Sequence, residues 1–230
     1  MRKVMTPFLS VNPKSYLYGQ DSLKLAKAAD RAAEKYGMQV FFTCCYTDLR
    51  LIKENTNNVV VTAQHMDAIY PGRGEGYVLP EALKDAGCEA VYMNHTEHAL
   101  TLETIYKTIC RAKELEMISI VCANSVAEGI ALATMNPEIL ICEPSELIGT
   151  GKTADDSYMG EVIRRIRGVN PEVKIVIGAS IATGEDCVRV LRAGADGTGA
   201  TSGIVKADDP CAKVDEMVHA MSSYWADTHK

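Results

Sequence analysis

The sequence lacks the features that mark membrane, nucleic-acid-binding and multidomain proteins. No apolar stretch reaches the roughly 20 residues that a helix needs to span a bilayer. The chain also has no basic excess, since 24 Lys and Arg stand against 30 Asp and Glu, a net charge of −6. Phosphate backbones favour basic surfaces, so we expect neither a nucleic-acid nor a membrane partner. No linker or low-complexity tract interrupts the chain, which predicts one domain over residues 1–230.

The eight cysteines show neither a disulfide framework nor a metal motif. There is no CxxC pair, and the adjacent Cys44 and Cys45 are poorly placed to bridge each other. Most of the others lie inside apolar segments, which indicates buried free thiols in a reducing cytoplasm. His and Cys nowhere cluster at ligand spacing, so we expect no metal. The N-terminal apolar run is broken by Pro7 and Asn12, which favours a first buried strand over a secretory signal.

Short apolar runs alternate with amphipathic segments along the whole chain. Consecutive Val, Ile and Phe residues are typical of strands covered on both faces, as in a parallel sheet under helices. The predicted strands are 4–12, 38–43, 59–63, 89–93, 117–122, 138–142, 173–177 and 195–200. The predicted helices are 20–36, 78–86, 102–115, 126–134, 158–167, 185–193 and 210–225. Glycines 37, 87 and 194 each follow a helical run, where a left-handed cap suits glycine.

Eight strand–helix units of roughly 29 residues each are close to the size of a βαβ repeat. This count favours a (β/α)₈ barrel over a doubly wound sheet, which usually has fewer strands. In such barrels the active site lies at the carboxyl ends of the strands. Polar or glycine-rich clusters occur there at Asn12-Pro13-Lys14, Asn94-His95-Thr96-Glu97, Glu143-Pro144-Ser145-Glu146, Gly178-Ala179-Ser180 and Thr201-Ser202-Gly203.

Three residues of these clusters suit proton transfer. Glu143 directly follows a strand, where partial burial strengthens a carboxylate as a base. His95 also follows a strand, and a helix beginning there would favour its neutral ring. Lys14 would add a cation. Taken alone, these residues are also explained as a solvated carboxylate, a structural histidine and a surface lysine.

Glycine-containing turns offer backbone N–H groups to a phosphate. The candidates are Gly149-Thr150-Gly151-Lys152, Gly178-Ala179-Ser180 and Ser202-Gly203. The first of them lacks the GxxxxGK spacing of a nucleotide-binding loop and follows the sixth strand, which argues against nucleotide binding.

Together these segments resemble the triosephosphate isomerase family, particularly its short archaeal form, from about Asn12 to Pro210. The resemblance rests on motifs that occur in the family's order: Asn12-Pro13-Lys14, Ala63-Gln64-His65, Val78-Leu79-Pro80-Glu81-Ala82-Leu83-Lys84, Asn94-His95-Thr96-Glu97, Ile120-Val121-Cys122-Ala123-Asn124 and Glu143-Pro144-Ser145-Glu146-Leu147-Ile148-Gly149-Thr150-Gly151.

The resemblance implies a (β/α)₈ TIM barrel that isomerises glyceraldehyde 3-phosphate and dihydroxyacetone phosphate without a cofactor. Glu143 would be the base, His95 and Lys14 would stabilise the enediolate, Asn12 would hold the substrate and Glu97 would orient the cations. The phosphate would bind Gly149, Ser180, Thr201 and Ser202, and the closing lid would include Pro144, Ser145, Glu146, Gly151 and Lys152. The resemblance also implies a homodimer or homotetramer.

Four departures from the family pattern keep alternatives open. Pro13 replaces an aromatic residue, His98 and Ala99 follow Glu97 where arginine is frequent, and Glu75 replaces a threonine that docks into a neighbouring subunit. Gly199 stands where a bulky residue usually walls the pocket, with Tyr92 and Met93 as possible compensating fillers. An isomerase for a four- or five-carbon sugar phosphate, and a barrel that binds a phosphorylated ligand without turnover, are the alternatives.

Overall fold

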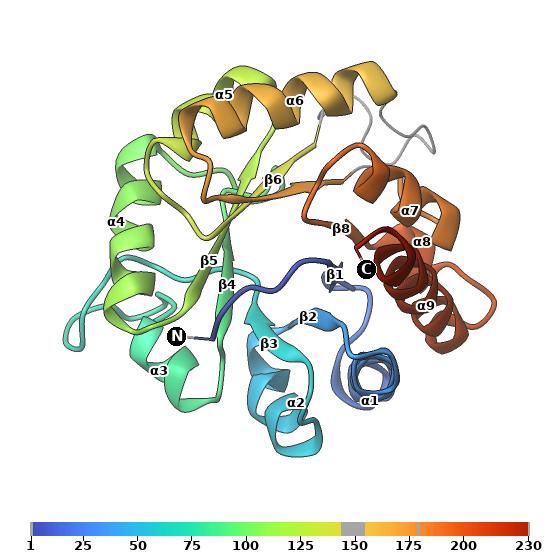
Figure 1. The fold of residues 1–230 in the computed structure, drawn as a ribbon. Helices are drawn as coiled ribbons and strands as arrows, with labels where there is room; N and C mark the ends of the chain where they lie inside the picture. Colours follow the sequence, from blue (N-terminus) through green and yellow to red (C-terminus); the bar gives the residue numbers. More distant parts are fainter. Residues whose placement is uncertain (1, 144–154, 179, 230) are drawn as a thin grey trace.

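The computed structural model describes residues 2–143, 155–178 and 180–229 of the chain. Eight parallel strands follow one another in chain order and close into a ring, with helices outside it (Figure 1). Pairing of the last strand with the first closes the barrel. The predicted (β/α)₈ barrel is therefore confirmed. The strands are β1 (Phe8–Val11), β2 (Gln39–Cys44), β3 (Val60–Ala63), β4 (Ala90–Met93), β5 (Ile118–Ala123), β6 (Ile139–Cys142), β7 (Lys174–Ile177) and β8 (Gly197–Ala200).

Within the described residues all seven predicted helices are present, together with three short ones that were not predicted from the sequence. The helices are α1 (Gly19–Tyr36), η1 (Tyr46–Asp48), α2 (Leu49–Asn55), α3 (Pro80–Asp85), α4 (Leu102–Glu114), α5 (Val126–Ala133), α6 (Asp156–Val169), α7 (Gly184–Arg192), α8 (Ser202–Val205) and α9 (Pro210–Thr228). In α2 only Leu49 and Ile52 are buried, so its apolar pattern is too short to reveal a helical period.

The centre of the barrel is filled unevenly, because β8 turns only glycines toward it. A Cβ on Gly197 would lie 2.8 Å from the ring of Phe8, which occupies that space. Phe8 in turn meets Phe41 edge to face, with ring centroids 5.2 Å apart. One layer higher, the Ser10 and Tyr92 hydroxyl oxygens lie 2.7 Å apart. Large side chains from β1, β2 and β4 therefore fill the space in the barrel that the glycines of β8 leave open.

Tyr92 and Met93 face opposite ways, as neighbours on a strand must. Tyr92 belongs to the apolar cluster inside the barrel, together with Phe8 and Phe41. Met93 belongs to the outer cluster between strands and helices. Of the two possible fillers for the space at Gly199, only Tyr92 points into the barrel, so Met93 was a wrong choice.

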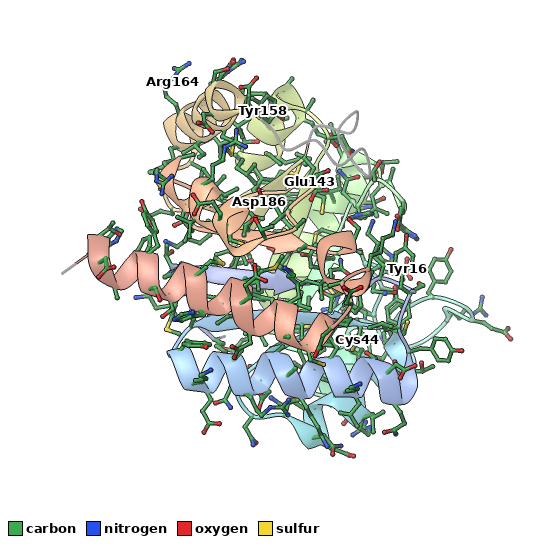
Figure 2. The ribbon with its side chains drawn as sticks, turned by 90° about the vertical axis from the view of Figure 1, so that its right-hand side faces the viewer. Tyr16, Cys44, Glu143, Tyr158, Arg164 and Asp186 are labelled. Atoms are coloured by element: carbon green, nitrogen blue, oxygen red, sulfur yellow. The ribbon has the colours of Figure 1, made fainter. Side chains whose placement is uncertain are left out.

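The outer layer closes where the first and last long helices meet. Figure 2 shows α1 and α9 running alongside each other in a side view of the barrel. The Tyr36 hydroxyl donates to Asp215 at 3.0 Å, and the Ser222 hydroxyl donates to the Tyr36 carbonyl at 3.0 Å. These contacts join the helices that flank β1 and β8, and so support the closure of the ring.

Helix ends follow the predicted chemistry. Gly37 caps α1 with a left-handed φ of 61°, a conformation that glycine adopts without strain. Thr183 and Asp186 form a capping box at the start of α7. None of the described helices combines the length and apolar character needed to cross a bilayer. All eight cysteines are free thiols, as expected.

One arginine of α4 contacts the loop between β3 and α3 at several points. The buried Arg111 of α4 donates through Nε to the Ile69 carbonyl at 3.1 Å, and its guanidinium lies 3.8 Å from the Tyr70 ring centroid. It also pairs with Glu81 and Glu114. The charged and aromatic contacts together give this exposed loop a defined shape.

Candidate active site

A cavity of about 200 Å³ opens among the loops at the carboxyl ends of the strands. Eight residues predicted for the site line it, namely Asn12, Lys14, His95, Glu97, Glu143, Ser180, Thr201 and Ser202. Pro144, Ser145, Glu146, Gly149, Gly151 and Lys152 lie outside the described residues. The barrel thus gathers in one place groups that are far apart in the sequence.

The backbone conformation at Lys14 and an ion pair with Glu97 fix the position of the Lys14 side chain at the cavity. Its φ of 50° is left-handed, and its N–H donates to the Asn12 side-chain oxygen at 2.9 Å. Its ammonium donates to a Glu97 carboxylate oxygen at 2.8 Å, and this hydrogen bond lowers the pKa of Glu97. The loop after β1 and the loop after β4 are therefore joined by a charge-assisted hydrogen bond.

His95 occupies a turn rather than the start of a helix, contrary to the sequence prediction. The His98 N–H donates to the His95 carbonyl at 2.7 Å, and helix α4 begins only at Leu102. The dipole of a helix beginning there therefore does not explain a neutral imidazole. Burial first, and the Lys14 ammonium second, lower the pKa of His95.

The hydrogen bonding of His95 also identifies its tautomer. The Glu97 backbone N–H donates to Nδ1 of His95 at 3.1 Å, so Nδ1 is the acceptor. In the neutral ring the proton then resides on Nε2. The imidazole can therefore donate a hydrogen bond through Nε2 while carrying no charge.

Asn94 shapes the turn that carries His95. It is buried with a left-handed φ of 57°, which asparagine tolerates better than most residues. Its side-chain amide donates to the Cys122 carbonyl at 2.9 Å and to Glu128 at 2.8 Å. Its side-chain oxygen accepts from the Leu100 N–H at 2.9 Å. Because these bonds reach β5, α5 and the segment before α4, they hold the chain on both sides of His95.

Glu143 enters the cavity directly after β6, anchored by its N–H to the Ala123 carbonyl at 3.1 Å. Its carboxylate lies where a side chain on residue 178 would otherwise project. A Cβ on Gly178 would lie 1.8 Å from a Glu143 oxygen, so the glycine makes room for this carboxylate. In Figure 2 Glu143 lies within the outline of the molecule, whereas Arg164 points outward from α6 at its edge.

The opposite end of the cavity is formed by the turns after β7 and β8. Ser180 has a left-handed φ of 57°, and Thr201 and Ser202 lie at the beginning of α8. A Cβ on Gly203 would lie 2.1 Å from the Ile181 carbonyl oxygen, so the two turns pack backbone to backbone. This close approach places Ser180 beside the start of α8.

A second cavity of about 250 Å³ adjoins the first and shares Asn12, Lys14, Tyr92, His95 and Glu97 with it. It is also lined by His65 and His98, whose ring centroids lie 4.3 Å apart. The His98 ring thus packs against the ring of His65, which follows β3.

Comparison with known proteins decides the family of this chain. A model described as triosephosphate isomerase matches residues 7–221. The chain belongs to the triosephosphate isomerase family. The triosephosphate isomerase of Methanothermus fervidus is 35% identical over 220 residues, covering 94% of this chain and 99% of the relative. That of Methanocaldococcus jannaschii is 36% identical over 213 residues, covering 90% of this chain and 97% of the relative. The resemblance to the archaeal form is confirmed.

Ser10 and Lys206, to which the sequence analysis gave no role, also line the cavity of this triosephosphate isomerase family member. Tyr92, which the sequence analysis considered only as a filler at Gly199, lines it too. The strand period could have placed Ser10 and Tyr92 inside the barrel. Lys206 lies beyond the unpredicted helix α8, so no periodic signal pointed to it. No group of three or more His, Cys, Asp or Glu side chains suited to a metal occurs within the described ranges.

We predict that His95 is neutral at pH 7 and that Lys14 contributes to this state. Since the folded pKa lies below the ordinary value of 6.5, protonation sets in only as the pH falls through that lower value. Lys14→Gln removes a positive neighbour and should raise the pKa of His95, though not fully to its ordinary value, because burial persists. NMR titration of the imidazole resonances, assigned with His95→Gln, measures both values.

Lys206→Gln serves as the matched control, because Lys206 is not among the groups that shift the pKa of His95. A His95 pKa that is unchanged in Lys14→Gln, or that rises equally in both variants, would contradict the assignment.

Proposed function

We propose that this chain, acting as a single domain over residues 1–230, interconverts glyceraldehyde 3-phosphate and dihydroxyacetone phosphate. Membership of the triosephosphate isomerase family implies a small phosphorylated sugar as substrate. The observation that carries the proposal is that Glu143, His95 and Lys14 line one cavity. A base, a neutral hydrogen-bond donor and a cation are the groups that proton transfer beside a carbonyl requires.

In the proposed mechanism the Glu143 carboxylate removes a proton from C1 of dihydroxyacetone phosphate. The electron pair left on C1 forms the C1–C2 double bond of an enediolate, and negative charge develops on the C2 oxygen. His95 Nε2–H and the Lys14 ammonium stabilise this oxygen, with Asn12 holding the substrate. Transfer of the O1 proton to O2 and return of the proton from Glu143 to C2 give glyceraldehyde 3-phosphate.

The longer-sugar isomerase is not favoured by the comparisons, because the relatives described above all bear the name triosephosphate isomerase. A barrel that binds a phosphorylated ligand without turnover would not need a base beside a neutral imidazole. Assaying the protein with glyceraldehyde 3-phosphate and with four- and five-carbon sugar phosphates separates the three functions.

We predict that Glu143→Gln lowers kcat for glyceraldehyde 3-phosphate by ~10²–10⁴-fold, because it removes the general base. The fold should persist, as judged by circular dichroism, because Gln matches Glu in shape. Glu161→Gln, an exposed change on α6 that only breaks a pair with Arg165, is the control and should retain activity. Turnover by Glu143→Gln at the rate of the parent protein would exclude Glu143 as the base.

The phosphate is proposed to bind at the turns carrying Ser180, Thr201 and Ser202, with Lys206 balancing its charge. Among the described residues, the ionised groups lining the cavity are Glu97, Glu143, Lys14 and Lys206. Lys14 and Glu97 neutralise each other, which leaves Lys206 to offset the catalytic carboxylate. Without Lys206 the described groups of the cavity would carry a net negative charge, which repels a dianionic substrate.

Lys206→Gln should therefore raise KM for glyceraldehyde 3-phosphate by about tenfold, which corresponds to ~1.4 kcal/mol, with a smaller change in kcat. Lys206→Arg should retain a low KM, and turnover of glyceraldehyde, which has no phosphate, should be unaffected. Steady-state kinetics at low and high salt measure these effects, since screening should shrink the difference. Equal loss with both substrates would contradict a role in phosphate binding.

We propose that the protein is a homo-oligomer, a dimer or tetramer. Five tyrosines in the segments after β1, β3 and β4 are between 55% and 72% exposed: Tyr16, Tyr18, Tyr70, Tyr77 and Tyr106. Tyrosines are enriched in protein interfaces, and the five exposed aromatic rings in these segments favour association. The loop with Tyr70 and Tyr77 is already held in shape by Arg111, which lowers the entropy lost on docking.

Sedimentation velocity over a range of concentrations tests this proposal, with a dimer or tetramer expected at micromolar protein. A monomer that persists at those concentrations would contradict it. The cytoplasmic location and the lack of nucleic-acid and membrane partners stay predictions; the free thiols support a reducing compartment.

A further inference from the structure

The floor of the active-site cavity is built by residues that compensate for a missing side chain. Gly199 lies at the cavity and turns no side chain into the barrel. A Cβ there would lie 3.3 Å from the Ser10 Cβ and 3.2 Å from its carbonyl oxygen. Ser10 and Gly199 are register partners on β1 and β8, so they occupy the same level of the barrel.

Tyr92 reaches this level from the other side of the ring. It belongs to β4, four strands away from β8 in a closed eight-stranded barrel. Its hydroxyl lies 2.7 Å from the hydroxyl of Ser10, next to Gly199, and its side chain is only 5% exposed. The phenol ring therefore spans the barrel beneath the cavity and occupies the volume that a bulky residue 199 would fill.

We propose that Tyr92 limits the depth of the cavity and thereby restricts the substrate to three carbons. This inference rests on the proposed function. The carbonyl end of the substrate is held by Asn12, Lys14 and His95, and the phosphate end by the turns after β7 and β8. Because the barrel strands fix the distance between the two binding regions, the chain of a substrate with an additional carbon must bend away from the straight path between them. Tyr92 and Ser10 block the direction toward the barrel floor.

The hydrogen bond to Ser10 fixes the position of the Tyr92 hydroxyl, whereas the Tyr92 ring fills the space beneath the cavity. Tyr92→Phe therefore separates the two contributions, because it removes the hydroxyl and keeps the ring. Tyr92→Leu shortens the side chain and opens the floor. Adding Gly199→Leu to Tyr92→Leu returns volume from the opposite strand. Met93→Leu is the matched control, since Met93 neighbours Tyr92 but packs outside the barrel.

The experiment compares kcat/KM for erythrose 4-phosphate with kcat/KM for glyceraldehyde 3-phosphate in each variant. Tyr92→Leu should raise the ratio of the two by about tenfold, the lower end of what one carbon contributes to discrimination in a pocket. Tyr92→Phe and Met93→Leu should leave the ratio near that of the parent protein. The double variant should bring the ratio back toward the parent value, which general destabilisation by two substitutions would not do.

An unchanged ratio in a folded Tyr92→Leu variant would overturn the proposal, and so would an equal rise in Tyr92→Phe. Tyr92→Met, whose unbranched side chain reaches further across the barrel than leucine, should shift the ratio in the same direction by a smaller amount. This variant tests the proposal if Tyr92→Leu does not fold. Unfolding of both variants would overturn the proposal, because residue 92 would then serve the fold alone. Absence of triose turnover in the parent protein would instead refute the proposed function.

Discussion

The closure of the barrel through the pairing of β8 with β1 is the constraint on which the site depends. Since every strand is parallel, this pairing places every carboxyl end on the same rim. The loop with Lys14 follows the first strand and the turn with Thr201 follows the last, yet both line one cavity. Their proximity is set by the register Val11↔Ala200 and the bonds around it. The α1–α9 contact supports the same seam from outside.

The barrel fold, and the positions of most candidate site residues around one cavity, could be predicted from the sequence because both leave local signals. Runs of Val and Ile, capping glycines and polar clusters at strand ends are readable without tertiary information. Helix α2 was missed because its two buried residues define no period. The environment of His95 was misjudged for another reason: whether a helix or a turn follows depends on Asn94, whose partners on β5 and α5 are distant in the sequence.

Electrostatics in the site are local and differ from the net charge of the chain. A protein of net charge −6 still places two ammonium groups in its cavity. Lys14 acts on two neighbours at once, pairing with Glu97 while lowering the pKa of His95. The sequence predicted Lys14, Glu97 and His95 as site residues. It could not show that the Lys14 ammonium lies close enough to Glu97 to pair with it, and this distance decides which charges cancel.

The two glycines of β8 also bear on how this barrel can change over generations. Gly197 tolerates no side chain, since a Cβ would lie 2.5 Å from the Phe8 carbonyl oxygen and 2.8 Å from its ring. Replacing Phe8 by a small residue would in turn leave a void beside Phe41. The carbonyl oxygen of residue 8 remains whatever side chain that residue carries, so a smaller residue 8 would still not make room for a side chain at position 197. Descendants of this sequence should therefore keep glycine at position 197 even where the residues around it change.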